Sequence, residues 1–192
     1  MTNLDEYRLV KGCQKGDQAA LTQLVKQYQG ALYNAAFRIL GDKEEAADAT
    51  QSSFLKVIER ITSFDTSKSL FSWIYRIAIN DAIDRSRKLW RATGLEESWV
   101  EDEGPGIEEQ LAEQETSQGL QRALMRIPTD ARALIVMKHL NSVSYTDIAE
   151  ILGVPEKTVK SRLYSARQQL KGVLERDPDF AHHWLAERED EP

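Results

Sequence analysis

The chain has 192 residues, enough for one large domain or two small ones, and 41% of them are hydrophobic and 29% charged. No apolar run approaches the roughly eighteen residues of a membrane span, so we expect no membrane insertion. The single cysteine, Cys13, excludes an internal disulfide, and we expect it to pack in or near a core. The first residues mix acids and bases without an apolar secretion signal, which predicts a cytoplasmic protein.

The formal net charge of −6 is unevenly spread along the chain. Residues 1–92 carry 14 basic and 11 acidic groups, and residues 118–176 carry 10 and 5. By contrast, residues 93–117 carry 9 acids and no base, and residues 177–192 carry 6 acids and 1 base. A Gly-Pro-Gly sequence at 104–106 also breaks regular structure. We predict two basic modules joined by a flexible acidic linker and followed by an acidic tail.

Apolar residues recur at helical spacing in both modules, and the period-2 alternation of half-buried strands is absent. This pattern predicts an all-α protein. Because each module is small, we expect each core to be built from three or four helices.

Residues 44–61 predict an amphipathic helix. Its expected buried side comprises Ala46, Thr50, Phe54, Val57, Ile58 and Ile61. The opposite side comprises Asp48, Ser52, Leu55 and Glu59. An apolar Leu55 on a polar face fits a protein-contact surface better than a DNA-contact surface, although single exposed leucines are common.

Residues 70–88 predict a second helix, whose buried stripe is Phe71, Ile74, Tyr75, Ala78 and Ala82. Its other side carries Trp73, Arg76, Asn80, Asp84 and Arg87. Two interpretations of Trp73 are open: its ring stacks on an unpaired base beside phosphate-binding neighbours, or it packs sideways on another helix. Phe64, in the polar loop just before this helix, is either the wall of a pocket for a flipped base or a core plug.

Residues 144–171 predict a helix-turn-helix. Ser144 and Asp147 resemble a capping box for the first helix, and Pro155 suits the first position of the second. The second helix has an apolar stripe of Val159, Leu163, Ala166 and Leu170. Its outer face consists of hydrogen-bonding side chains: Lys157, Lys160, Ser161, Tyr164, Ser165, Gln168 and Lys171, flanked by Arg162 and Arg167. A recognition helix in the DNA major groove has this design, and a merely solvated basic face is the alternative.

An enzyme would need clustered ligands or an acid–base pair, and the chain shows neither. The histidines are His139, His182 and His183, and no Cys/His cluster or metalloprotease motif is present. We therefore predict no catalytic residue, no metal site and no cofactor. For the tail, whose Phe180 and Trp184 are helical neighbours, we expect disorder or a loosely docked helix.

Four sequence blocks resemble a known family. They are "GDQAALTQLVKQY", "DATQSSF", "FSWIYRIAINDAIDRSRK" and "SYTDIAEILGVPEKTVKSRLYSAR". In their order and spacing the chain resembles the extracytoplasmic-function (ECF) sigma factors of the sigma-70 superfamily, the small two-domain promoter-specificity subunits of bacterial RNA polymerase. The resemblance covers about residues 5–92 and 118–174.

The resemblance implies that the 1–92 module binds core polymerase and melts DNA. Contacts to the clamp helices of the largest polymerase subunit would come from Asp48, Gln51, Ser52 and Leu55. Ser52 stands where the family pattern has an acid. Recognition and melting of the minus-ten element would involve Phe64, Asp65, Ser69, Trp73, Arg76 and Asn80.

The resemblance also implies that the 118–176 module reads the minus-thirty-five element as duplex and lies at the flap region of the polymerase. The residues nominated for DNA are Lys157, Thr158, Lys160, Ser161, Arg162, Tyr164, Ser165 and Arg167. Ser165 replaces a residue that is often basic. The acidic linker would thread toward the active-site and RNA-exit channels, and an anti-sigma factor would be a further partner. A stand-alone helix-turn-helix regulator is the alternative, and it leaves the first module without a role.

Overall fold

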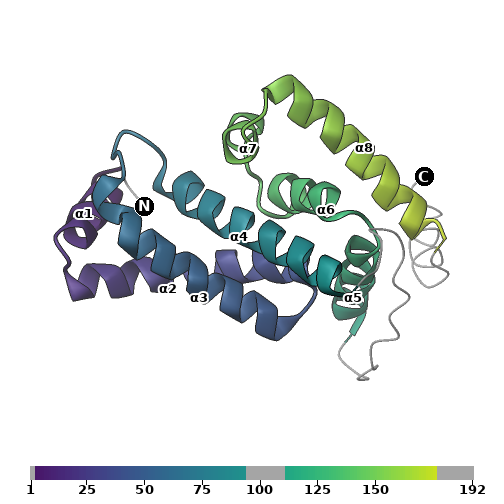
Figure 1. The fold of residues 1–192 in the computed structure, drawn as a ribbon, viewed down its shortest axis with the longest axis horizontal. Coiled ribbons are helices and arrows are strands. Elements are labelled where there is room, and N and C mark those ends of the chain that lie inside the picture. Colours follow the sequence, from purple (N-terminus) through teal and green to yellow (C-terminus); the bar gives the residue numbers. More distant parts are fainter. Residues whose placement is uncertain (1–2, 94–110, 177–192) are drawn as a thin grey trace.

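The computed structural model describes residues 3–93 and 111–176, which form eight α-helices and two short helical turns (Figure 1). In chain order these are α1 (Asn3–Gln14), α2 (Gln18–Leu40), α3 (Lys43–Arg60), the 3-10 turn η1 (Ile61–Ser63), α4 (Leu70–Thr93), α5 (Leu111–Met125), α6 (Thr129–Ile135), the π-helical turn η2 (Val136–Leu140), α7 (Tyr145–Leu152) and α8 (Glu156–Leu174). No β-strand occurs in these two ranges. The all-α prediction is confirmed.

Helices α1 to α4 form the first module, in which the long helices α2, α3 and α4 pack on one another. The fully buried side chains at its centre are Leu24, Leu32, Ile39, Val57, Leu70, Ile74, Tyr75 and Ile79. The buried stripe predicted for α4 is confirmed, with Phe71 half-buried at its edge. Cys13 is buried, as expected. In Figure 1, α4 runs between α3 and the helices of the second module, so it belongs to the core of one module and the boundary of the other.

Short polar residues define where the helices of the first module begin. Asp17 caps α2 by accepting from the Ala19 amide at 2.8 Å, and Asp42 caps α3 through the Glu44 and Glu45 amides. Gly41, which ends α2, has φ of 78° and lies under the Met125 side chain of α5. A Cβ atom at Gly41 would be 2.6 Å from the Met125 sulfur, so both the turn and the contact between modules require glycine.

Helices α5 to α8 form the second module, with α7 and α8 as the helix-turn-helix. The predicted Ser144 cap is confirmed: its hydroxyl accepts from the Asp147 amide at 3.0 Å. The Asp147 carboxylate accepts from this hydroxyl at 2.5 Å, and not from the Ser144 amide as in a full capping box. Gly153, with φ of 64°, ends α7. Pro155 is the N-cap of α8 and not its first helical residue, so the helix starts one residue later than predicted. The stripe predicted on α8 faces inward, with Leu170 half-buried at its end.

The two modules pack directly on each other, which the sequence did not predict. The Ser86 and Thr129 hydroxyls form a buried hydrogen bond of 2.9 Å across the boundary. Arg132 is fully buried there, and its guanidinium donates to the carbonyl of Ile39 at the end of α2 and to that of Ile127. A charge can be buried in this way because oriented carbonyl groups replace its water.

Two other expectations differ from the structure. Ile58 was predicted to be buried, but 37% of it is exposed, because α3 turns it toward an open groove and not toward α4. Helix α5 begins at Leu111, inside the stretch predicted as linker. The predictions for 94–110 and for the 177–192 tail, with its two histidines, lie outside the described residues.

Candidate protein and nucleic-acid interfaces

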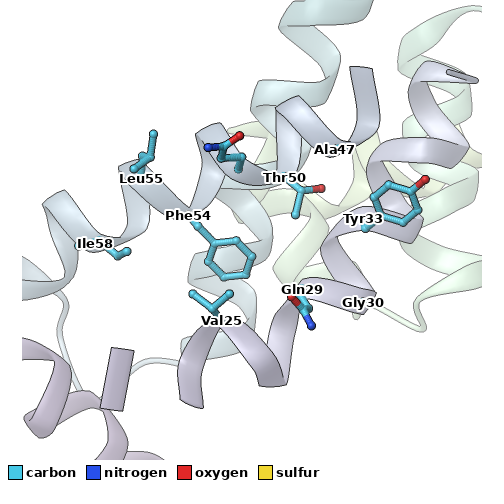
Figure 2. A pocket seen from close by; sticks show the side chains of 10 residues that line it. Val25, Gln29, Gly30, Tyr33, Ala47, Thr50, Phe54, Leu55 and Ile58 are labelled. Carbon is cyan, nitrogen blue, oxygen red and sulfur yellow. The ribbon is translucent and has the colours of Figure 1, made fainter. Parts of the chain in front are cut away.

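A groove of about 570 Å³ runs between α2 and α3 (Figure 2). It is lined by Val25, Gln29, Gly30 and Tyr33 from α2 and by Ala47, Thr50, Gln51, Phe54, Leu55 and Ile58 from α3. On its rim, Leu55 is 57% exposed. An apolar groove beside an exposed leucine has the shape and chemistry to receive a helix of another protein.

Two of the four residues predicted to contact protein line this groove, and the other two, Asp48 and Ser52, do not. Gln51 and Leu55 line the groove, exposed Asp48 lies one turn before Gln51, and Ser52 is half-buried beside it. The α2 wall was not predicted. Its residues Val25, Gln29 and Tyr33 recur at intervals of four, a row that could have been identified from sequence spacing alone.

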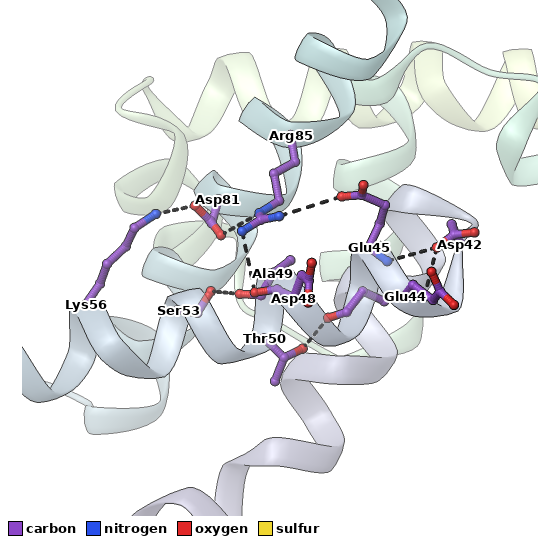
Figure 3. Close-up of polar contacts among 11 residues, drawn as sticks. Asp42, Glu44, Glu45, Asp48, Ala49, Thr50, Ser53, Lys56, Asp81 and Arg85 are labelled. Carbon is purple, nitrogen blue, oxygen red and sulfur yellow. Dashed lines mark hydrogen bonds and ion pairs between the residues drawn. The ribbon is translucent and has the colours of Figure 1, made fainter.

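A polar network behind the groove fastens α3 to α4 (Figure 3). Arg85 of α4 pairs with Asp81 at 3.2 Å and with Glu45 of α3 at 3.6 Å, and it donates to the Asp48 carbonyl at 3.5 Å. Lys56 of α3 pairs with the same Asp81. Because charged groups on both helices share partners, the network holds the exposed face of α3 in one orientation.

A second cavity, of about 350 Å³, lies where the 64–69 loop meets α4 and α7. It is lined by Ser63, Phe64, Asp65, Lys68, Ser69, Ser72, Trp73 and Arg76, and on the α7 side by Asp147, Glu150 and Ile151. Five of the six residues predicted for the minus-ten element are thus brought together. The sixth, Asn80, is exposed about one turn further along α4 and does not line the cavity.

Phe64 and Trp73 pack on each other in the wall of this cavity. Their ring centroids are 4.9 Å apart at 44°, Phe64 is only 6% exposed, and Trp73 is half-buried. Phe64 is both a buried core residue and part of the cavity wall, and the Trp73 ring packs against Phe64 of the loop. The pair forms a rigid apolar floor under the polar loop.

The polar loop residues are ordered by their own hydrogen bonds. The Asp65 carboxylate accepts from the Ser67 amide at 2.9 Å, and hydrogen bonds from Ser67 lower the pKa of Asp65. Ser69 accepts from the Ser72 amide at 3.2 Å in the first turn of α4. An ionised Asp65 is an acceptor for base amino groups, while Arg76 is a donor for phosphate.

The outer face of α8 is exposed, as predicted. Lys157, Lys160, Ser161, Arg162, Tyr164, Ser165 and Arg167 are exposed and Thr158 is half-buried. A hydrogen bond of 2.6 Å from Lys160 to Glu156 raises the pKa of Lys160, so its ammonium stays charged. The Nε atom of Arg167 donates to Nε2 of His139 at 2.9 Å. Burial and the neighbouring charge of Arg167 lower the pKa of His139, which favours the neutral ring that can accept this bond.

Residues 3–93 and 111–176 contain no cluster of three or more side chains suited to a metal ion. None of the helices in the same ranges combines the length and apolar character of a membrane span.

Comparisons with known proteins agree with this arrangement. The model of Sigma-70 region 2 matches residues 24–92, and that of Sigma-70 region 4 matches residues 117–170. The chain is 33% identical over 176 residues to the ECF RNA polymerase sigma factor SigW of Bacillus subtilis, covering 86% of this chain and 94% of that protein. It is 36% identical over 159 residues to the ECF RNA polymerase sigma factor SigM of Mycobacterium tuberculosis, covering 83% and 79%.

Among solved structures, the fold is similar to that of the sigma factor RpoE in complex with the anti-sigma factor NepR from Bartonella quintana. The TM-score is 0.64 at 26% identity, covering 81% of this chain and 97% of that one. The chain belongs to the ECF family of RNA polymerase sigma factors.

Proposed function

We propose that this chain is an alternative sigma factor that binds core RNA polymerase and directs transcription initiation at a particular set of promoters. The observation that carries the proposal is the α2–α3 groove, present in a chain that also exposes a DNA-reading face on α8. A stand-alone helix-turn-helix regulator would use α8 but would have no need for a protein-docking groove in a second module.

The polymerase contact is assigned to the exposed side of α3. Leu55 and the groove receive apolar side chains from the clamp helices of the largest subunit, while Asp48, Gln51 and Ser52 form hydrogen bonds at the rim. This division is typical of protein interfaces, in which an apolar centre excludes water and a polar rim sets orientation. The second module makes a further contact at the flap region.

The minus-ten element is assigned to the 64–69 loop and the exposed side of α4. Asp65 and Ser69 read a base that has left the stack, over the Phe64–Trp73 floor. Arg76 and Asn80 hold the backbone of the unpaired strand. Such a site favours single strands because a base inside a duplex cannot enter the cavity.

The minus-thirty-five element is assigned to α8, which enters the major groove and recognises this element as double-stranded DNA. Lys160, Ser161, Tyr164 and Ser165 face the bases, while Lys157, Thr158, Arg162 and Arg167 contact phosphates nearer the edges of the face. The side chains of Ser161 and Ser165 donate back to carbonyls of their own helix, so their hydroxyl oxygens face DNA as acceptors.

Several features of this sigma factor are proposed from the family. The acidic stretch that precedes α5 lies in positively charged polymerase channels, which accounts for an acidic chain with two basic modules. An anti-sigma factor holds the chain inactive in the cytoplasm until a signal releases it, in line with the solved complex of RpoE with NepR. The chain needs no cofactor and contributes no catalysis of its own.

Run-off transcription tests the proposal. Core polymerase is incubated with a library of promoter fragments, with and without the chain, and the transcripts are sequenced. We expect discrete start sites that depend on the chain and share two upstream elements. If the isolated chain instead bound a duplex operator specifically and produced no new transcripts with core polymerase, the stand-alone regulator would be the correct assignment.

A further inference from the structure

Helix α1 holds the 61–70 segment at both of its ends. At the first end, the Gln14 side-chain amide donates to the Ile61 carbonyl at 3.0 Å and to the Phe64 carbonyl at 3.1 Å. At the second end, the Glu6 carboxylate accepts from the Leu70 amide at 3.3 Å, in the first turn of α4. The segment between these contacts contains the Asp65 and Ser69 side chains that line the cavity.

The orientation of the Gln14 amide follows from its neighbours. Its oxygen accepts from the Lys11 ammonium at 3.1 Å, so its nitrogen must face the loop. Both amide hydrogens of Gln14 are then used by loop carbonyls, and Gln14 is itself half-buried. Because the Gln14 side chain is held by Lys11 and bonds to two loop carbonyls, it restrains the loop backbone at Ile61 and Phe64.

Helix α1 is itself held firmly enough to act as a support. Leu9, Val10 and Cys13 are buried against the rest of the module. Gly12 allows the close approach of α1 to α2, because a Cβ atom there would lie 2.7 Å from that of Ala20. The packing of α1 on the rest of the module therefore fixes the position of Gln14.

We propose that Gln14 and Glu6 are positioning residues that shape the 61–70 segment to receive an unpaired base before DNA arrives. The inference rests on the proposed function, and both residues precede the 24–92 segment that the region 2 model matches. A loop that is already ordered loses little conformational entropy when it binds, so these contacts increase affinity for single-stranded DNA without touching it. Neither residue lines the cavity.

The two contacts are tested by substitutions that keep the size of the side chain but remove its hydrogen-bond donor or acceptor. Gln14→Met keeps the length of the side chain but cannot donate, and Gln14→Glu keeps the Lys11 contact but loses the donors to the loop. From the worth of two neutral hydrogen bonds, we expect either change to weaken minus-ten single-strand binding by about tenfold. Glu6→Gln keeps an acceptor for the Leu70 amide and should behave as wild type, whereas Glu6→Met should not. Gln27→Met, at an exposed position of α2, is the matched control.

The measurement uses the holoenzyme and a fluorescent single-stranded minus-ten oligonucleotide, intact or with one abasic position at a time. For the wild type, one abasic position should weaken binding strongly and so identify the captured base. With Gln14→Met, that abasic effect should shrink, because the loop no longer holds the base well. A smaller abasic effect in the variant shows that Gln14 and the captured base are energetically coupled, as expected of a positioning residue. A general loss of structure would instead lower the affinities for intact and abasic oligonucleotides by the same factor.

Affinity for core polymerase and the circular dichroism melting curve are measured in parallel. Equal losses with intact and abasic oligonucleotides, or a parallel loss of core binding, would show that Gln14 is only structural and overturn the inference. The inference would also be overturned if the abasic position weakened binding as strongly in both Gln14 variants as in the wild type. A wild-type holoenzyme that binds no promoter strand at all would contradict the proposed function instead, so the two failures are distinguishable.

Discussion

Glu150 of α7 lies 3.8 Å from Arg76 of α4, so a carboxylate of the second module is paired with a cation that the first module is proposed to offer to DNA. The same carboxylate lies 3.7 Å from Lys68 in the 64–69 loop. The Arg76 and Glu150 side chains are 47% and 54% exposed, and exposed pairs of this kind contribute only about 0.2–1 kcal/mol. A DNA phosphate can therefore displace Glu150 at little cost.

Removing the charge of Glu150 should favour DNA at this cavity. We expect Glu150→Gln to raise the affinity of the isolated chain for a minus-ten single strand, by at most about fivefold, because a weak competing pair is lost. Fluorescence anisotropy at low salt measures the effect, which should fade as salt screens the pair. Glu44→Gln, an equal charge change at an exposed position of α3, is the control. Equal gains in both variants would indicate only the change in net charge.

The exposed side of α3 should be required for polymerase binding and dispensable for folding. We expect the double change Asp48→Ala and Gln51→Ala to weaken binding to core polymerase and Leu55→Asp to weaken it further, since a charge would enter an apolar interface. Because these side chains are exposed, the free energy of unfolding should change by no more than about 0.5 kcal/mol. Co-purification and titration with labelled core polymerase measure the loss. Undiminished binding would remove the assignment of this face.

Helix periodicity predicted the fold well because burial on a helix repeats with the helix turn. The stripes of α4 and α8 follow their sequence spacing closely, and the Ser144 cap was recognisable from side-chain chemistry. Ile58 shows the limit of this reasoning. Its position on α3 is near the boundary between the two faces, and a groove can open there only where α2 leaves space. Periodicity gives the direction of a side chain but not what lies opposite.

The contacts between distant segments could not be predicted for a related reason. Gln14 meets the Phe64 loop, and Arg132 meets the end of α2, through backbone carbonyls. Every residue has a carbonyl, so the partner of such a contact leaves no signature in the sequence. Likewise, nothing in the sequence distinguishes Glu150 from other exposed acids, because its pairing with Arg76 depends on how α7 packs beside α4.

Arg132 should stabilise the boundary between the modules. We expect Arg132→Met to lower the free energy of unfolding by about 3 kcal/mol, because the buried Ile39 and Ile127 carbonyls lose a donor. Arg132→Lys should recover part of the loss, since one ammonium cannot reproduce the planar guanidinium. Urea unfolding measures the change, and small-angle scattering tests whether the modules separate. An unchanged midpoint in Arg132→Met would contradict this role.

The outer face of α8 should determine which upstream element is used. We expect Lys160→Ala to reduce open-complex formation on promoters that depend on that element, by about five- to hundredfold if Lys160 contacts a base bidentately and by less if it contacts only phosphate. The salt dependence of binding separates the two cases, because loss of one phosphate contact lowers the slope by about one. Equally strong open complexes on promoters with a scrambled upstream element would exclude α8 as the reader.

Strand opening distinguishes a sigma factor from other DNA-binding proteins, and the exposed side of α4 is assigned to it. Holding a base out of the stack costs a few kcal/mol, roughly, which contacts to the unpaired strand must offset. We expect the double change Arg76→Ala and Asn80→Ala to leave polymerase binding nearly normal while reducing the number of permanganate-reactive thymines in the minus-ten region.

A template with a pre-melted bubble separates opening from all later steps. Because the unpairing cost has already been met, the bubble should restore much of the transcription lost in the Arg76 and Asn80 double variant. The position of Asn80 outside the cavity adds a finer expectation: Arg76→Ala alone should impair capture of the flipped base, whereas Asn80→Ala alone should mainly affect the strand further along α4. If the double variant opened linear duplex promoters as well as wild type, or if the bubble gave no rescue, the melting site would have to lie elsewhere on the first module.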